Sequence, residues 1–246
     1  MDFKAYVLLP AFNEQAALQK LIPSISEALR AAGYAFEITV ADDGSSDGTS
    51  QVLHDLAEKY PVYSLRHNVN KGYGAALNTG YTAILSKAQP RDIVLSMDAD
   101  TTHSPSYFPA MIKKIPEGFD VVTASYIMQG GKAQGVPFPR QIMSWGANTL
   151  FRLFFPVSGG QTYTNGFRAY KVAVLQRIQA RYGDPLITQT GFPGGTELFL
   201  KSIKAGARIG EIPFTLHYQN RGSGSKIHLR ATILGYLRLI RLALSF

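Results

Sequence analysis

The sequence predicts an α/β protein with a mostly parallel central sheet and helices on both of its faces, and three observations support this fold class. Short apolar runs such as 6–9 and 93–97 have the composition of strands that are buried on both faces. Stretches with apolar residues at helical spacing lie between these runs. Strand–helix–strand units of this length favour parallel strands, because the intervening helix returns the chain to the same end of the sheet.

The first hundred residues alternate regularly between strands and helices. We expect four strands in this part, at 6–9, 36–41, 62–65 and 93–97. We expect helices between them, one carrying apolar residues from Leu18 to Leu29, one carrying them from Val52 to Tyr60, and a glycine-rich one at about 71–86. Asn13 is expected to cap the first helix, because its side chain can accept a hydrogen bond from a free backbone N–H, and Gly33 is expected to end it.

The second half of the chain has a different rhythm. After about Ser125, prolines and three Gly-Gly pairs divide it into shorter pieces. We expect helices in this part at about 141–155, 171–181 and 196–204. The run 209–218 is predicted to be one more strand, at an edge of the sheet, because Pro213 lacks the backbone N–H that an inner strand needs.

Composition and charge limit the classes of partner. The 246 residues include 25 Lys and Arg against 17 Asp and Glu, and this net charge of +8 favours a nucleic acid, a phosphorylated small molecule or a membrane surface. Nucleic acid is the poorest of the three, because the basic residues form no reader motif and no aromatic stacking pattern. The absence of cysteine excludes disulfides, thiolate metal sites and cysteine nucleophiles. We expect no secretory signal peptide and no apolar stretch of about 18 residues that would span a bilayer unaided.

Three polar clusters directly follow predicted strands, at 10–14, 42–49 and 98–103. In open α/β sheets, ligands bind beyond the carboxyl ends of the strands. The clusters are tens of residues apart in the sequence, but this topology brings them to one edge of the sheet. That edge is therefore the candidate binding site.

Asp98 and Asp100 are the most specific signal at this edge, since two carboxylates separated by one residue directly follow a predicted buried strand. Mg²⁺ commonly binds one or two carboxylates together with the phosphates of a substrate. The alternative is a solvated turn in which one Asp caps the next helix.

Two further segments have both a structural and a functional interpretation. Asp42 and Asp43 begin either an ordinary Asp-Gly turn, capped by Ser46 or Asp47, or a site where carboxylates meet a base, a ribose or a cation. The segment 68–74 is either a loose phosphate cradle or a place where glycines allow close helix packing.

In this order and at this spacing, the motifs resemble those of family 2 glycosyltransferases of the GT-A fold, with a Rossmann-like nucleotide-binding half. The motifs are Leu9-Pro10-Ala11-Phe12-Asn13-Glu14, Asp42-Asp43-Gly44-Ser45-Ser46-Asp47-Gly48-Thr49, Asn70-Lys71-Gly72 and Asp98-Ala99-Asp100. Within that family the chain looks most like the dolichyl- or polyprenyl-phosphate sugar synthases, on weaker signals at 165–168, 211–213 and 221–226. The resemblance implies a single catalytic domain over 1–225, with a nucleotide-sugar half at 1–105 and an acceptor half at 106–225.

The resemblance also implies roles for individual residues. The residues that match the family's nucleotide-sugar site are Pro10, Phe12, Asn13, Glu14, Val40, Asp42, Asp43, Lys71, Gly72, Asp98 and Ala99. Asp100, with Asp98 and Thr102, matches the segment that holds a Mg²⁺ or Mn²⁺ ion. Arg221 and Lys226 match a basic pair that meets donor or acceptor phosphates. The expected catalytic residues are therefore Asp98, Asp100, Arg221 and Lys226.

The implied reaction is an inverting, metal-dependent transfer of a hexose from a nucleoside diphosphate sugar, of the GDP-mannose or UDP-glucose type, to a polyprenyl or dolichyl phosphate. A lipid phosphate is already anionic and needs no strong general base. A saccharide hydroxyl would need one. Glu197 is the candidate base in that alternative, unless it only complements the dipole of its helix.

A third interpretation is a non-catalytic nucleotide-sugar-binding protein. It draws on two departures from the family's pattern, at Tyr126 and Thr162. Tyr126 and Thr162 stand where the family usually has Arg and Asp. Separately, the basic segment 221–226 is one residue shorter than the family's.

The C-terminal segment 226–246 is predicted to be a basic amphipathic helix. At about 100° per residue, Lys226, Arg230, Arg238 and Arg241 fall on one arc about 120° wide, and apolar residues fill the remainder. Such a helix suits an anionic membrane surface, and the alternative is a helix that packs on the core with its arginines in solvent. We expect a protein at the cytoplasmic face of a membrane, peripheral or tethered through its C-terminus, because the pattern runs to Phe246 without a cap signal and is expected to continue toward membrane segments.

Overall fold

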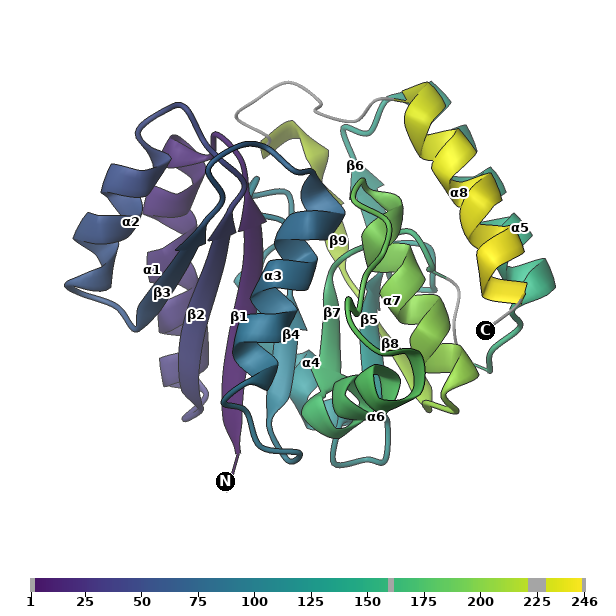
Figure 1. Ribbon diagram of the computed structural model, residues 1–246, viewed down its shortest axis with the longest axis horizontal. Helices are drawn as coiled ribbons and strands as arrows, with labels where there is room; N and C mark the ends of the chain where they lie inside the picture. Colours follow the sequence, from purple (N-terminus) through teal and green to yellow (C-terminus); the bar gives the residue numbers. More distant parts are fainter. Residues whose placement is uncertain (1–2, 159–161, 221–228, 245–246) are drawn as a thin grey trace.

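The computed structural model describes residues 3–158, 162–220 and 229–244, and its central sheet has seven strands in the order β3-β2-β1-β4-β7-β5-β8 (Figure 1). These strands are β1 (Lys4–Ala11), β2 (Ala35–Asp42), β3 (Val62–Arg66), β4 (Ile93–Ser96), β5 (Val121–Ser125), β7 (Arg168–Lys171) and β8 (Ile209–Pro213). A second sheet pairs β6 (Lys132–Gln134) with β9 (Thr215–His217). Only β7 runs antiparallel to its neighbours in the central sheet, so the predicted α/β class with a mostly parallel sheet is confirmed.

Helices cover both faces of the sheet (Figure 1). The α-helices are α1 (Gln15–Ala31), α2 (Thr49–Ala57), α3 (Tyr73–Leu85), α4 (Phe108–Lys114), α5 (Phe138–Phe154), α6 (Val172–Tyr182), α7 (Pro193–Lys204) and α8 (Leu229–Leu244). Two short 3₁₀ helices are Pro105–Tyr107 and Tyr218–Asn220. The core on one face is built with α1, α2 and α4, and the core on the other face with α3 and α5 to α8.

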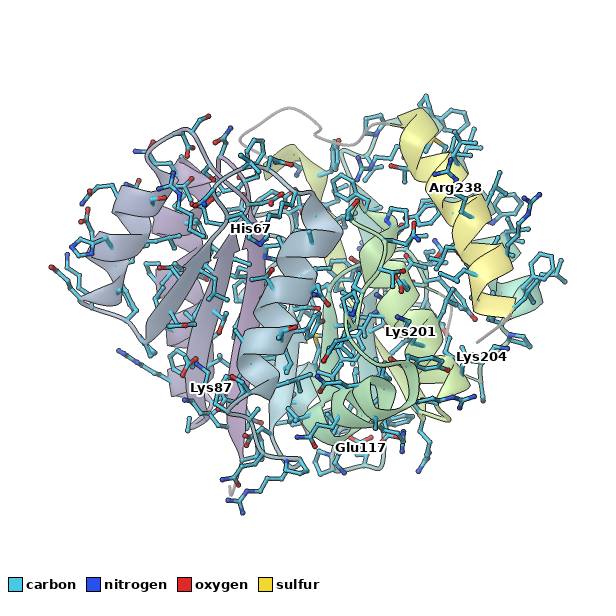
Figure 2. All side chains as sticks on the ribbon, viewed as in Figure 1. His67, Lys87, Glu117, Lys201, Lys204 and Arg238 are labelled. Carbon is cyan, nitrogen blue, oxygen red and sulfur yellow. The ribbon has the colours of Figure 1, made fainter. Side chains whose placement is uncertain are left out.

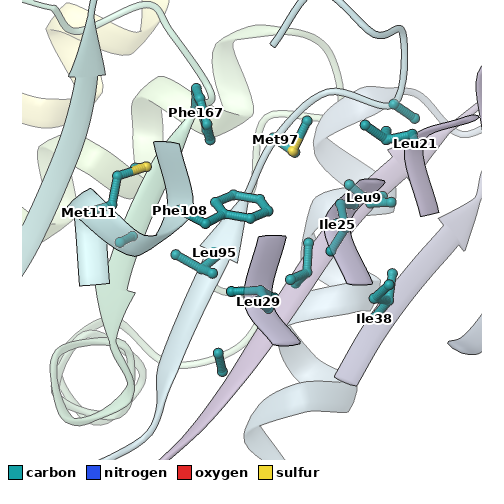
Figure 3. Packing of buried hydrophobic residues seen from close by; sticks show 14 of the residues in the cluster. Leu9, Leu21, Ile25, Leu29, Ile38, Leu95, Met97, Phe108, Met111 and Phe167 are labelled. Carbon is teal, nitrogen blue, oxygen red and sulfur yellow. The ribbon is translucent and has the colours of Figure 1, made fainter. Parts of the chain in front are cut away.

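The central strands are apolar throughout because each contributes to both cores. In β1, Val7 and Leu9 belong to the cluster under α1, whereas Tyr6 and Leu8 belong to the cluster under α3. Figure 3 shows the first cluster, in which Leu9 and Leu95 of neighbouring strands lie among side chains from α1 and α4. Alternate residues of a strand point to opposite faces, so an uninterrupted apolar run is what a strand between two helical layers requires.

Asn13 does not cap α1, and that prediction was wrong. The helix begins at Gln15, and its N-cap residue, Glu14, makes no side-chain cap hydrogen bond. The Oδ1 atom of Asn13 instead accepts hydrogen bonds from the backbone N–H groups of Ser46, at 2.8 Å, and Asp47, at 3.4 Å. The carboxamide therefore ties the loop after β1 to the loop after β2.

The second half departs from the sequence pattern in three places. The run 209–218 is divided: β8 forms an edge of the central sheet, as predicted, but β9 leaves it to pair with β6. The predicted helix 171–181 is present as α6, but the four residues up to Lys171 form a strand, β7, that directly precedes it. The short strands β5 to β7 were not among the predicted elements.

Helix α8 packs against α7 and lies beside α5 (Figure 1). Leu239, Ile240 and Ala243 are buried in the core beneath it, whereas Arg238 and Arg241 are exposed. Its described residues therefore form an amphipathic helix that docks on the core. No helix in the described ranges is long and apolar enough to cross a membrane.

Candidate active site

Two neighbouring cavities open at the carboxyl edge of the central sheet. The first has a volume of about 460 Å³ and is lined by the loops after β1, β2 and β4 and by the start of α3. The second, of about 550 Å³, extends toward α5 and the 3₁₀ helix 218–220. The residues that line both cavities are Tyr73, Asp98, Asp100, Phe192 and Thr232. The predicted convergence of the three polar clusters at one sheet edge is confirmed, and Asp98 and Asp100 lie where the cavities meet.

The structure brings most of the predicted nucleotide-sugar residues to the first cavity. Those that line it are Pro10, Phe12, Glu14, Asp43, Gly72, Asp98 and Ala99. Strand register explains this convergence. Strands β1 and β2 end together at the pair Ala11–Asp42, and β4 ends at Ser96 beside Leu8, so the loop after β4 starts next to the last residues of β1. Whether these residues bind a nucleotide sugar stays a prediction.

Four other predicted residues are not part of the cavity lining. Val40 is fully buried within β2, and Asn13 bonds the loop at 46–47. The Asp42 carboxylate accepts hydrogen bonds from the Ser45 N–H and the Ser50 hydroxyl, each at 2.9 Å. Lys71 contributes its backbone N–H to Asp43, while its side chain is exposed. These residues shape the loops around the cavity, and their role in binding the nucleotide sugar stays a prediction.

The Asp43 carboxylate holds the loop that precedes α3. Its Oδ1 atom lies 2.7 Å from His67 Nδ1 and accepts a hydrogen bond from the Lys71 N–H, and its Oδ2 atom accepts one from the Gly72 N–H. The other ring nitrogen of His67 (Figure 2) lies 2.9 Å from the Thr79 hydroxyl of α3. Asp43 therefore both lines the first cavity and fixes one of its walls.

The glycines at the start of α3 allow another loop to pack against it. The Gly74 N–H donates to the Thr190 carbonyl at 2.7 Å, and a Cβ atom at Gly74 would lie 1.9 Å from the Gln189 carbonyl oxygen. A side chain there would collide with backbone, so residue 74 must be glycine. Close packing was the structural interpretation of the segment 68–74, and the structure shows this packing at Gly74.

Asp98 and Asp100 are each oriented by hydroxyl groups. The Tyr73 hydroxyl donates to Asp98 Oδ1 at 2.8 Å. The Thr102 hydroxyl and N–H donate to Asp100 Oδ1 at 2.6 and 3.2 Å. Burial and the neighbouring Asp98 charge raise the pKa of Tyr73 well above its ordinary value, so the phenol remains a proton donor.

These carboxylates fit a divalent cation that is also held by its substrate. The described residues contain no group of three or more His, Asp or Glu side chains that could hold a metal ion by themselves. Two carboxylates on one cavity wall match a hard cation that takes its other oxygen ligands from phosphate and water. Thr102 uses its hydroxyl proton on Asp100, and its oxygen lone pairs would still be chemically suited to a cation.

Glu197 is a structural residue, contrary to its candidacy as a general base. Its side chain is fully buried and pairs at 2.7 Å with Lys201, which Figure 2 labels. It also accepts hydrogen bonds from the N–H groups of Thr188 and Gln189 and from the Thr188 hydroxyl, at 2.8 to 2.9 Å. It lines neither cavity. The helix-dipole alternative also falls, because α7 has no acidic residue in its first turn.

The second cavity is lined by an arginine that the sequence analysis missed. Arg140 of α5 lines it, and its guanidinium carbon lies 5.0 Å from the centre of the Tyr218 ring. Tyr126, at the position where the family usually has Arg, lines the same cavity and hydrogen-bonds Ser144. Burial raises the pKa of Tyr126, while the Ser144 bond and the charge of Arg140 oppose that rise. Arg140 belongs to none of the predicted motifs, so its positive charge is the only signal in the sequence that could have identified it.

Two of the expected catalytic residues, Arg221 and Lys226, lie outside the described residues. Thr162, the other departure from the family pattern, is fully buried and its hydroxyl lies 2.6 Å from that of Ser125. Thr162 and Ser125 thus form a neutral hydrogen-bonded pair at the place where the family usually has Asp.

Helices α5 and α8 both carry large apolar side chains that are exposed. These side chains are Phe138, Ile142, Trp145, Leu153 and Phe154 on α5, and Ile233, Leu234, Leu237, Leu242 and Leu244 on α8. We call this set the α5–α8 surface. Trp145, the single tryptophan of the chain, is 65% exposed and also lines the second cavity. Exposed apolar clusters of this kind mark interaction sites for proteins or membranes.

The chain is similar in sequence to a known protein family and to two named relatives. The sequence profile described as glycosyl transferase family 2 matches residues 6–179. The dolichol-phosphate mannosyltransferase of Pyrococcus furiosus is 32% identical over 238 residues, which are 96% of this chain and 62% of that protein. The polyprenol monophosphomannose synthase of Mycolicibacterium smegmatis is 29% identical over 91% of this chain and 83% of its own length. The chain therefore spans less than two thirds of the Pyrococcus relative.

Among solved structures, glucosyl-3-phosphoglycerate synthase from Mycobacterium tuberculosis, in complex with Mn²⁺, uridine diphosphate and glucosyl-3-phosphoglycerate, matches with a TM-score of 0.68. The match covers 99% of this chain and 80% of that one, at 20% identity. At that identity the likeness concerns the fold alone.

Proposed function

The chain belongs to glycosyl transferase family 2 and is a glycosyltransferase of the GT-A fold, and from this premise we propose that it transfers a hexose from a nucleoside diphosphate sugar to a polyprenyl phosphate. The transfer would invert the configuration at the sugar carbon. The names of the Pyrococcus and Mycolicibacterium relatives support a lipid phosphate acceptor. The observation that carries the proposal is the place of Asp98 and Asp100, which line both cavities.

In this proposal the first cavity holds the donor. Pro10, Phe12 and Asp43 would surround its nucleoside, and its diphosphate would lie toward Asp98 and Asp100. These two carboxylates would hold a Mg²⁺ or Mn²⁺ ion, with Thr102 orienting Asp100. A bound divalent cation stabilises the negative charge that develops on the diphosphate as the glycosidic bond breaks. The Mn²⁺ in the Mycobacterium structure supports this assignment by analogy of fold.

The second cavity would receive the acceptor phosphate. Arg140 supplies positive charge there, and guanidinium groups bind phosphate through paired hydrogen bonds. A phosphate monoester oxygen carries its own negative charge and can attack without a strong general base. A phosphate acceptor therefore needs no carboxylate base, which agrees with the burial of Glu197 in an ion pair with Lys201.

We further propose that the α5–α8 surface rests on an anionic membrane, at its cytoplasmic face. Exposed apolar side chains would enter the interfacial region, and Arg238 and Arg241 would meet lipid headgroups. Trp145 connects the α5–α8 surface to the second cavity, which suits an acceptor whose chain stays in the membrane while its phosphate enters the site.

A transfer assay tests this function. The protein is incubated with Mn²⁺, a labelled donor (GDP-mannose or UDP-glucose) and either a polyprenyl phosphate, a free saccharide or no acceptor. We expect label in the lipid phase only with the polyprenyl phosphate. Label on the saccharide would instead indicate a hydroxyl acceptor, and neither transfer nor donor hydrolysis, despite donor binding, would indicate a binding protein.

A further inference from the structure

Tyr73 lies in the segment 68–74, but the sequence pattern assigned no role to its own side chain. It is the first residue of α3, yet its side chain lines both cavities. Its hydroxyl donates a 2.8 Å hydrogen bond to Asp98 Oδ1, across 25 positions of sequence. The loop after β4 is thereby joined to the glycine-rich start of α3 at the junction of the cavities.

Two neighbours fix the Tyr73 side chain. On one side the Phe192 ring stacks on it, with ring centroids 5.0 Å apart and planes inclined by 17°. On another side Gly166 leaves room for the hydroxyl, because a Cβ atom at that position would lie 2.6 Å from Tyr73 Oη and 3.5 Å from Asp98 Oδ1. Real Cβ atoms do not approach so closely, so the Tyr73–Asp98 hydrogen bond requires glycine at position 166.

We propose that Tyr73 is a positioning residue, whose hydroxyl holds the Asp98 carboxylate in the orientation that receives the divalent cation and the donor diphosphate. The inference rests on the proposed function, and it adds a role for Tyr73, Phe192 and Gly166. A hydrogen bond to one carboxylate oxygen restricts rotation of the group. Loss of such an outer partner of a metal-binding group typically costs about 10- to 100-fold in metal affinity or activity.

Two substitutions remove the hydrogen bond in different ways. Tyr73→Phe keeps the ring and its stack on Phe192 but deletes the hydroxyl. Gly166→Ala keeps the hydroxyl but places a methyl group where the hydroxyl lies. In the Tyr73→Phe background that methyl finds space, since the nearest remaining atom of the ring, Cζ, is 3.9 Å away. The second substitution should therefore cost much less when the first is present.

The measurement is binding of Mn²⁺ in the presence of a nucleoside diphosphate, followed by titration calorimetry, with turnover recorded separately. We expect Tyr73→Phe and Gly166→Ala each to weaken Mn²⁺ binding about tenfold, and the double variant to be no weaker than Tyr73→Phe alone. Unfolding temperatures should stay near that of the wild type for Tyr73→Phe. The control is Tyr34→Phe, which removes the hydroxyl of a buried tyrosine that contacts Phe3 and lines neither cavity; it should not change Mn²⁺ binding.

Wild-type Mn²⁺ binding and turnover in Tyr73→Phe would overturn the positioning role and leave the proposed function standing. Penalties that simply add in the double variant would also overturn it, because Gly166→Ala would then act by another route. If the wild-type protein itself bound neither Mn²⁺ nor nucleotide, the proposed function would fail, and this inference with it.

Discussion

The Asp43 carboxylate and the His67 ring form a buried pair, with Oδ1 and Nδ1 2.7 Å apart, and the same carboxylate accepts hydrogen bonds from the N–H groups of Lys71 and Gly72. A residue expected to bind the donor is thus also the anchor of the loop beside it. Asp42, its neighbour in sequence, accepts hydrogen bonds from Ser45 and Ser50 in the turn and helix that follow it, and its Oδ2 atom lies 3.8 Å from Arg66 Nε. We therefore expect Asp43 to contribute both to donor binding and to stability, and Asp42 to contribute to stability alone.

Asp43→Asn is expected to lower both stability and donor affinity. An amide nitrogen cannot accept from Lys71 or Gly72, and an unsatisfied buried donor costs about 1–3 kcal/mol. Asp42→Asn should cost similar stability but leave the donor KM of the folded enzyme near the wild-type value. Thermal unfolding and donor KM measured on both variants check this. An unchanged donor KM in Asp43→Asn would contradict the role of Asp43 in shaping the cavity.

Asp100→Asn is expected to lower turnover by about 100-fold or more, the usual effect of losing a principal stabiliser of developing charge. Metal-independent binding of the nucleotide should persist, because the nucleoside contacts are elsewhere in the cavity. Glu117→Gln, at an exposed surface ion pair with Lys114, is the matched control and should keep wild-type turnover (Figure 2). A turnover near that of the wild type in Asp100→Asn would remove the metal assignment.

Glu197→Gln is expected to act on stability rather than on chemistry. It removes the negative charge beside the buried Lys201 ammonium, which keeps its hydrogen bond to the Leu186 carbonyl, and breaking one side of a buried ion pair costs about 3–5 kcal/mol. The double change Glu197→Gln and Lys201→Met should recover part of that loss. Chemical denaturation measures both. A variant Glu197→Gln that unfolds like the wild type but no longer transfers sugar would restore the general-base role.

Vesicle binding tests the α5–α8 surface, and Trp145 is the natural probe because it is the single tryptophan. We expect its fluorescence to shift to the blue with vesicles of phosphatidylcholine and phosphatidylglycerol, and less with phosphatidylcholine alone. Replacing Leu234 and Leu237 by Ser should weaken binding by about tenfold or more, since each leucine that leaves water contributes on the order of 1.5 kcal/mol or more.

The matched control for vesicle binding is Val69→Ser, because Val69 is 63% exposed but belongs to the loop before α3. It should bind vesicles as the wild type does. Equal weakening in Val69→Ser and in the leucine variant would show that the α5–α8 surface has no special part in binding.

The first half of the fold was predictable from the sequence because its inner strands are apolar runs that alternate with helices whose apolar residues recur at helical spacing. There, one edge of a parallel sheet collects all three polar clusters, and Asp98 and Asp100 could be placed there before any coordinates. The second half was less predictable because β7 has four residues, among them the buried Arg168, and runs antiparallel. No local pattern of hydrophobicity identifies such a strand.

The site residues that sequence reasoning missed depend on contacts between distant segments. Tyr73 reaches Asp98 only because residue 166 is glycine, and Arg140 reaches the second cavity from the first turn of α5. Conversely, Asn13 and Asp42 have the residue types of a binding site, but Asn13 bonds the loop after β2 and Asp42 bonds within its own turn. Residue type and spacing indicated which loops meet, but not which side chains face the cavity.

The most direct test of the whole account is a crystal structure of the protein with Mn²⁺ and a nucleoside diphosphate, with the metal located by its anomalous scattering. We predict a single strong peak within coordination distance of an Asp100 carboxylate oxygen, bridged to the diphosphate, with the nucleoside in the first cavity. A nucleotide bound away from the loops after β1, β2 and β4, or a metal peak remote from Asp98 and Asp100, would contradict it.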